Sequence, residues 1–250
     1  MRPLILISND DGVTAKGINF LVEVLRPYAD IFVMAPDGPR SGGSCAITST
    51  VPLRYAKLHE EEGLTICSCT GTPVDCVKVA VNEALQRMPD MVIGGINHGD
   101  NSAVNAHYSG TMGVCYEGAM QGVPSIAFSL DDHSANADFT PLKSAIVEIT
   151  LKVLKKGLPA FTCLNVNFPK CAEFKGIKVC RMGISRWTKE TRACTHPSTG
   201  KPYIWLVGNR ENLEPQATDT DIWALEHGYV AVTPVTLDCT DYALFNQLKF

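Results

Sequence analysis

Residues 4–12 read LILISNDDG, four apolar residues followed by five polar or turn-forming ones. A short continuous apolar run is typical of a parallel strand that is buried on both faces of a sheet. Beyond the turn, apolar residues recur at helical spacing between positions 18 and 25, and residues 31–35 form a second apolar run. The chain therefore opens as strand, helix, strand, which favours an α/β fold.

The alternation of strands and helices continues to about residue 170. Further strands are expected at residues 48–55, 64–69, 91–96, 125–130 and 163–168. Helices are expected between them, at residues 74–85, 111–121 and 141–156. This order predicts right-handed βαβ units and a three-layer, Rossmann-like, mostly parallel sheet.

The pattern loosens in the last third of the chain. Strand-like pieces are expected there at residues 177–180, 203–207 and 229–233, and a helix at 219–227. The polar, turn-rich segment 188–201 is expected to be an exposed excursion. We therefore predict a single domain over residues 1–250, with a core at 1–170 and a β-rich and helical extension at 171–250.

Composition limits the classes of partner. The 250 residues are 45% hydrophobic and 19% charged, with a formal net charge of -4. An acidic balance gives no general reason to bind nucleic acid polymers or anionic membranes. No apolar stretch approaches the ~20 residues that span a bilayer. Ten cysteines are scattered without a C-x-x-C pair, so free thiols and a reducing cytoplasm are expected.

Polar, glycine-containing loops follow three of the predicted strands. They cover residues 8–12, 37–43 and 97–101, and the last leads on to Ser109, Gly110 and Thr111. In an open α/β sheet, ligands bind beyond the carboxyl ends of the strands. We therefore expect these loops to meet at one edge of the sheet and to form the functional site.

Asp10 and Asp11 are the strongest candidates for a metal site. Two adjacent carboxylates at the end of a buried strand repel each other, and a divalent cation removes that conflict. Hard ions such as Mg²⁺ or Mn²⁺ prefer oxygen ligands, and Ser41 and Asn97 add a hydroxyl and an amide carbonyl. The alternative is an Asx-turn in which Asp11 only caps the following helix.

Ser109, Gly110 and Thr111 open a predicted helix and are expected to hold phosphate. Free backbone N–H groups, hydroxyls and the positive end of the helix dipole form an anion site. The alternative is that Ser109 is simply an N-cap with nothing bound. Four other residues of these loops are expected to contact the substrate: Asn9, Arg40, Gly42 and Asn101. For Arg40, a position on the surface with no role in binding is an equally good prediction.

These motifs, in this order, resemble the SurE survival-protein family. The resemblance covers nearly the whole chain. It is carried by ILISNDDG (5–12), APDGPRSG (35–42), TGTPVDCVK (70–78), GINHGDN (95–101), YSGTM (108–112), EGA (117–119), LNVNFP (164–169) and residues 218–235 with GYVAVTP.

The resemblance implies a metal-dependent phosphomonoesterase that hydrolyses nucleoside 5'- and 3'-monophosphates, with short polyphosphate as a further substrate in some members. The family's metal ligands match Asp10, Asp11, Ser41 and Asn97, with one Mg²⁺ or Mn²⁺ in each subunit. Catalytic roles are implied for Asp10, Asp11 and Asn97. A C-terminal arm exchanged between subunits, with a C-terminal helix, implies a homodimer or homotetramer.

Two departures and two rival functions stay open. Between Asn101 and Tyr108 the family usually has a glycine and acidic residues, but residues 102–107 here read SAVNAH, and Cys45 stands where a polar residue is common. A phosphoaspartate phosphatase of the haloacid-dehalogenase kind would separate its aspartates by one residue, whereas Asp10 and Asp11 are adjacent, which argues against that function. A nonenzymatic nucleotide-binding regulator would keep the anion site without a metal. The attacking group, water or an aspartate, is not decided by the sequence.

Overall fold

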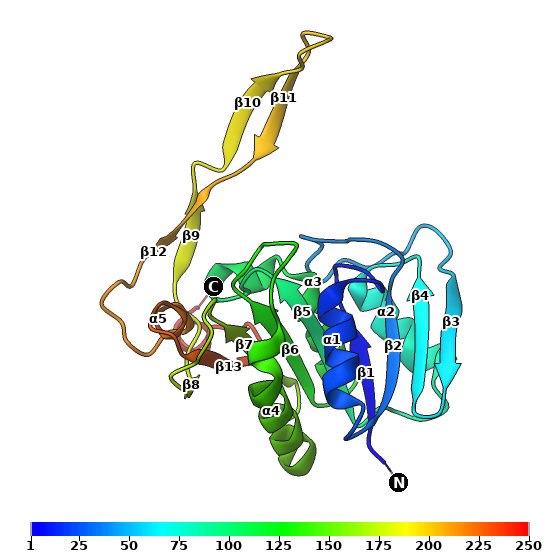
Figure 1. Cartoon of the computed structure of the whole chain (residues 1–250). Coiled ribbons are helices and arrows are strands. Elements are labelled where there is room, and N and C mark those ends of the chain that lie inside the picture. Colours follow the sequence, from blue (N-terminus) through cyan, green and yellow to red (C-terminus); the bar gives the residue numbers. More distant parts are fainter. Residues whose placement is uncertain (1, 250) are drawn as a thin grey trace.

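A nine-stranded sheet forms the centre of the molecule in the computed structural model, which describes residues 2–249 (Figure 1). The strand order is β3-β4-β2-β1-β5-β6-β7-β13-β8. The strands are β1 (Leu4–Ser8), β2 (Asp30–Pro36), β3 (Tyr55–Glu61), β4 (Leu64–Cys69), β5 (Met91–His98), β6 (Ser125–Leu130), β7 (Thr162–Phe168), β8 (Ile177–Val179) and β13 (Val230–Thr236).

The six strands from β4 to β7 are all parallel and follow the order of a doubly wound Rossmann-like sheet. Only β3 and β13 pair antiparallel to a neighbour in this sheet, with β4 and β7 respectively. The predicted mostly parallel α/β fold is thus confirmed. The order reverses between β1 and β5, and the crevice above that reversal is where ligands bind in such folds.

Helices cover both faces of the sheet, which gives three layers (Figure 1). On one face lie α1 and α4, and on the other lie α2 and α3. Strand β1 is buried on both sides because Ile5 and Ile7 join the core with α1 while Leu6 joins the core with α2. The helices are α1 (Lys16–Leu25), α2 (Pro73–Val79), α3 (Gly110–Met120), α4 (Lys143–Lys156), α5 (Asp221–Glu226) and α6 (Tyr242–Phe245).

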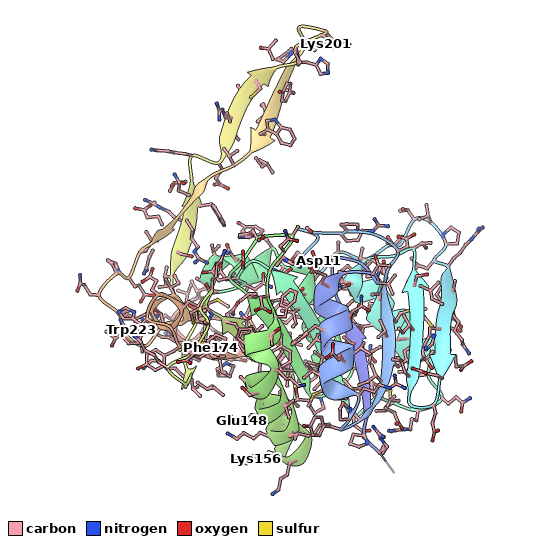
Figure 2. The ribbon with its side chains drawn as sticks, viewed as in Figure 1. Asp11, Glu148, Lys156, Phe174, Lys201 and Trp223 are labelled. Carbon is pink, nitrogen blue, oxygen red and sulfur yellow. The ribbon has the colours of Figure 1, made fainter. Side chains whose placement is uncertain are left out.

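An arm of two short paired ribbons projects away from this body (Figure 1). Its base is the antiparallel pair β9 (Ser185–Thr188) and β12 (Asn209–Asn212). Its outer part is the pair β10 (Thr191–Thr195) and β11 (Pro202–Leu206), with Lys201 at the tip in Figure 2. The segment 188–201 is exposed as expected, but it contains strand β10, which was not predicted.

The strand predicted at residues 48–55 is wrong. Residues 48–54 have no strand structure, and β3 begins only at Tyr55. The backbone N–H of Thr48 donates to both carboxylate oxygens of Asp75 at 3.1 Å, and Pro52 has no N–H to give to a ladder. The start of this segment is therefore held by a side chain of α2, and its end, Arg54, bonds Thr70 just beyond β4.

Candidate active site

The first loop of the site is a tight turn after β1 that Asn9 closes. Its amide oxygen accepts from the N–H of Gly12 at 3.1 Å, and its amide nitrogen donates to the Gly12 carbonyl at 3.0 Å. Gly12 has a φ of 100°, and a Cβ there would lie 3.2 Å from the carbonyl carbon of Gly38. Asn9 thus shapes the turn, which lies against the loop after β2.

Asp10 joins three of the predicted loops. Its side chain is buried at 3% exposure. The N–H of Arg40 donates to its backbone carbonyl at 2.7 Å, and the hydroxyl of Thr111 donates to its Oδ1 at 2.6 Å. A Cβ on Gly110 would lie 2.8 Å from the Asp10 Cβ. The loops after β1 and β2 and the start of α3 therefore meet, as expected from the strand ends.

The start of α3 has the geometry of a capped helix. The Ser109 hydroxyl accepts from the N–H of Met112 at 3.1 Å, which is the N-cap bond. The Asp10 carboxylate lies at the positive end of the same helix, where the Gly110 amide also acts on it. The hydroxyls of Ser109 and Thr111 are thus both engaged within the protein.

The two aspartates share an environment that disfavours their charge. Burial raises the pKa of Asp10 to about 6, and the charge of Asp11 adds to the rise against the lowering effect of the Thr111 hydrogen bond. Burial also raises the pKa of Asp11, and the charge and backbone amide of His98 oppose that rise. The Oδ2 atom of Asp11 is buried without a hydrogen-bond partner. Figure 2 shows Asp11 above the start of α1, at the edge where the loops emerge.

Asn97 is the last residue but one of β5 and directly precedes His98. The charge and backbone amide of His98 lower the pKa of Asp11 against the effect of burial, which relates the end of β5 to the loop after β1. The pairing of β5 with β6 shifts register between Gly94 and Asn97, as at a bulge that redirects a side chain. The Asn97 amide nitrogen donates to the Gly99 carbonyl at 2.9 Å, and its oxygen is the atom suited to ligate a cation.

The set of residues fits a hard divalent cation. Within residues 2–249 no group of three or more His, Cys, Asp and Glu could hold a metal ion, so a zinc-type cluster is not found there. Two carboxylates, an amide oxygen and a hydroxyl are instead the oxygen donors that Mg²⁺ or Mn²⁺ takes, together with water. An orphaned buried carboxylate oxygen on Asp11 is the feature that a cation would satisfy. Ser41, which is exposed, directly follows Arg40 on the loop bonded to Asp10.

The other residues that were predicted to contact the substrate differ in their exposure and in their bonding partners. Arg40 forms an exposed ion pair with Asp37 at 2.9 Å, so its charge is near the site but already partnered. Gly42 is exposed, with a φ of 73°. Asn101 is buried, with its amide nitrogen on the Ser129 hydroxyl at 2.8 Å. That contact gives Asn101 a partner inside the protein.

Sequence reasoning missed Asp100 and Arg210, which form a 2.5 Å ion pair beside the site. They are 110 residues apart, and a single sequence carries no signal for a pair at that separation. Asp100 stands in the GINHGDN motif, but only its neighbours were assigned. His98, which was left without a role, packs edge-on against Phe139 at 5.2 Å between ring centroids.

Residues 5–189 match the family model described as survival protein SurE. The chain belongs to the SurE family. It is 56% identical to the 5'-nucleotidase SurE of Phocaeicola vulgatus, across 99% of this chain and 96% of the relative. It is 51% identical to the 5'-nucleotidase SurE of Bacteroides fragilis, across 99% and 97%. The crystal structure of SurE from Aquifex aeolicus matches with a TM-score of 0.84 and 38% identity, covering 99% of this chain and 98% of that one.

Membership of the SurE family confirms the resemblance that the sequence motifs indicated. It also confirms the expectation of an enzyme, a hydrolase, because the SurE relatives carry an enzyme's name. Among the described residues, no helix is both long and apolar enough to cross a membrane.

Proposed function

We propose that this SurE-family chain is a metal-dependent 5'-nucleotidase that releases phosphate from nucleoside monophosphates. The observation that supports it most directly is the position of Asp10, bonded to Thr111 at 2.6 Å and adjacent in sequence to the half-buried carboxylate of Asp11. One corner thus combines a candidate cation site with the positive end of a helix, which are the two features that bind a phosphate ester.

Asp10, Asp11, Ser41 and Asn97 would hold the metal ion. A bound Mg²⁺ or Mn²⁺ would supply a Lewis acid for a phosphate oxygen and would lower the pKa of a water. The Gly99 carbonyl fixes the Asn97 amide by accepting from its nitrogen, so that the amide oxygen is left for the ion. Asp11 offers its buried, unpartnered Oδ2 either as a ligand or as an acceptor for a proton.

The tip of α3 would stabilise the phosphate as negative charge shifts in the transition state. Backbone amides and the dipole of an eleven-residue helix are fixed before reaction, so they need no reorganisation. Arg40 and Asn9 lie on the adjoining loops and belong to the proposed substrate set with Gly42 and Asn101. Attack by water and attack by an aspartate are both compatible with this arrangement.

Hydrolysis of 3'-monophosphates and of short polyphosphate is part of the same proposal, as is a cytoplasmic location that suits ten free cysteines. We also propose that the arm joins subunits into a homodimer or homotetramer, with residues 171–250 as the extension that supplies it. Its outer strand carries exposed Ile204, Trp205 and Leu206 in a row, which is unusual for a surface that stays in water.

The decisive experiment measures phosphate release from AMP or GMP with Mn²⁺ or Mg²⁺, with and without EDTA. We expect turnover that EDTA abolishes and that Asp10→Asn removes while the circular dichroism spectrum stays unchanged. Full activity of Asp10→Asn would refute the site. Tight nucleotide binding without any turnover would favour the nonenzymatic regulator, and a trapped phosphorylated aspartate would exclude direct attack by water.

A further inference from the structure

We propose that Arg210 and Trp187, at the base of the arm, are positioning residues that keep the metal-binding Asn97 aligned. Both lie in the paired strands β9 and β12, where they are direct partners in the register. Both reach the loop of residues 99–107, which connects Asn97 to the start of α3. The inference rests on the proposed function, because it assigns the arm a role at the same site.

Arg210 bonds the first part of this loop. Its Nη1 donates to Asp100 Oδ2 at 2.5 Å and to the Ser102 hydroxyl at 3.0 Å. The hydroxyl of Ser102 itself donates to the carboxylate of Asp100. The side chain of Asp100 is only 7% exposed, so removal of Arg210 would leave a buried charge with weaker compensation.

Trp187 bonds the second part of the loop. Its indole N–H donates to Asn105 Oδ1 at 3.0 Å. The Asn105 amide nitrogen in turn donates to the Asp100 carbonyl at 3.2 Å. Both contacts from the arm therefore act on Asp100. Arg210 bonds its carboxylate directly, and Trp187 acts on its backbone carbonyl through Asn105.

Asp100 directly follows the residue that orients Asn97. The Gly99 carbonyl accepts from the Asn97 amide nitrogen at 2.9 Å, and the Gly99 N–H donates to Leu130 at 2.8 Å. A shift of Asp100 would move the Gly99 carbonyl, and the Asn97 amide nitrogen would lose the shorter of its two contacts and keep only the His98 carbonyl at 3.3 Å. The arm thereby acts on Asn97, the proposed metal ligand, through the backbone of Asp100 and Gly99.

Both contacts from the arm fall within the segment 102–107, which reads SAVNAH, or on Asp100 just before it. Ser102 and Asn105, within that segment, are the residues that receive Arg210 and Trp187. Polar side chains of this segment are thus bonded to residues of the arm more than 80 positions away in the sequence.

The test compares Arg210→Met, Arg210→Lys and Trp187→Phe with the control Arg186→Met in the full-length protein. Arg186 lies on β9 and pairs with Glu211 on β12 at 2.8 Å, with 63% side-chain exposure. Its removal therefore takes an ion pair from the same ribbon without touching the loop. Trp187→Phe keeps the ring and removes the N–H, so it remains informative if Arg210→Met folds poorly.

The first readout is hydrogen–deuterium exchange of the metal-free protein. In Arg210→Met and Trp187→Phe we expect amides of residues 99–107 to exchange about tenfold faster, as loss of a buried hydrogen bond allows. Arg210→Lys, which keeps a charged donor, should fall between them and the wild type. Exchange in α1 and the behaviour of Arg186→Met should stay unchanged.

The second readout is Mn²⁺ affinity by calorimetry, for which we expect a loss of about tenfold in Arg210→Met, in the range found for outer partners of metal ligands. Unchanged exchange and unchanged affinity in both Arg210→Met and Trp187→Phe would overturn the inference. Equal effects in Arg186→Met would overturn it as well. A wild type without nucleotidase activity would refute the proposed function alone, because the exchange experiment needs no turnover.

Discussion

The hydroxyl of Thr111 donates a 2.6 Å hydrogen bond to the carboxylate of Asp10, which lies 101 residues earlier in the chain. This bond joins the end of the first strand to the start of α3. It also lowers the pKa of Asp10 against the larger effect of burial. One side chain thus both fixes the geometry of the carboxylate and favours its charged form.

Thr111→Val should lower kcat/KM for AMP by about tenfold or more, since a hydrogen bond to a charged group contributes ~1.5–3 kcal/mol. Valine has nearly the shape of threonine but cannot donate, so Asp10 loses a partner while packing is kept. Thr111→Ser keeps the hydroxyl and should retain most of the activity. Steady-state kinetics with Mn²⁺ checks this, and equal losses in the two variants would point to packing instead.

The metal-free protein should lose stability as the pH rises from about 4 to about 6. The pKa of Asp10 is about 6 in the folded chain and 3.8 is its ordinary value, so between them the folded state keeps a proton that the unfolded state has released. Ionisation then opposes folding, by on the order of 3 kcal/mol once the pH exceeds the folded pKa. Urea unfolding at several pH values in EDTA measures this contribution.

Asp10→Asn is the control for the pH experiment because asparagine does not titrate. The variant should be at least as stable as the wild type at pH 7 without metal, and its stability should vary less between pH 4 and pH 6. A wild type and variant with the same pH dependence would contradict the assignment of that dependence to Asp10.

The core was predictable because its strands carry their own signal. Strand β1 is apolar at every position from 4 to 7, and burial on both faces of a parallel sheet requires that pattern. The position of the site followed from topology, since loops after neighbouring parallel strands share one edge. Asp10, Asp11 and Thr111 come together for that reason.

Other parts of the fold have no such signal. All seven residues of β3 are exposed, so no buried face imposes an alternation of apolar and polar residues. The strand exists because its backbone pairs with β4, a contact that a local pattern does not show. In the arm, likewise, β10 is held by pairing with β11, and Arg210 meets Asp100 only once both have folded.

Gly17→Ala should destabilise the protein by ~1–3 kcal/mol, the usual range for an overpacked core. A Cβ at position 17 would lie 2.2 Å from the carbonyl oxygen of Ile96, so α1 would have to move away from β5 just before Asn97. Thermal unfolding should show a lower Tm and Mn²⁺ binding should weaken. Gly38→Ala is the matched control, because a Cβ there has nothing within 4 Å, and a Tm loss of equal size in it would contradict the prediction.

Trp205→Glu should dissociate the proposed oligomer. Trp205 is 61% exposed on β11 and its neighbour Leu206 is 83% exposed, an apolar surface that a second copy of the chain would cover. A buried carboxylate opposes such an interface, so light scattering after gel filtration should report a smaller mass than for the wild type. Met120→Glu, which changes an exposed apolar residue of α3 away from the arm, should leave the mass unchanged.

The same Trp205→Glu variant also separates the two ends of the arm. Its tip carries the proposed subunit contact, whereas Arg210 and Trp187 bond the active-site loop from the base. Mn²⁺ affinity should therefore stay near the wild-type value in Trp205→Glu even as the mass falls. A mass that remains unchanged would refute the subunit contact, and an affinity that falls with the mass would show that the loop needs the neighbouring subunit as well as the base of its own arm.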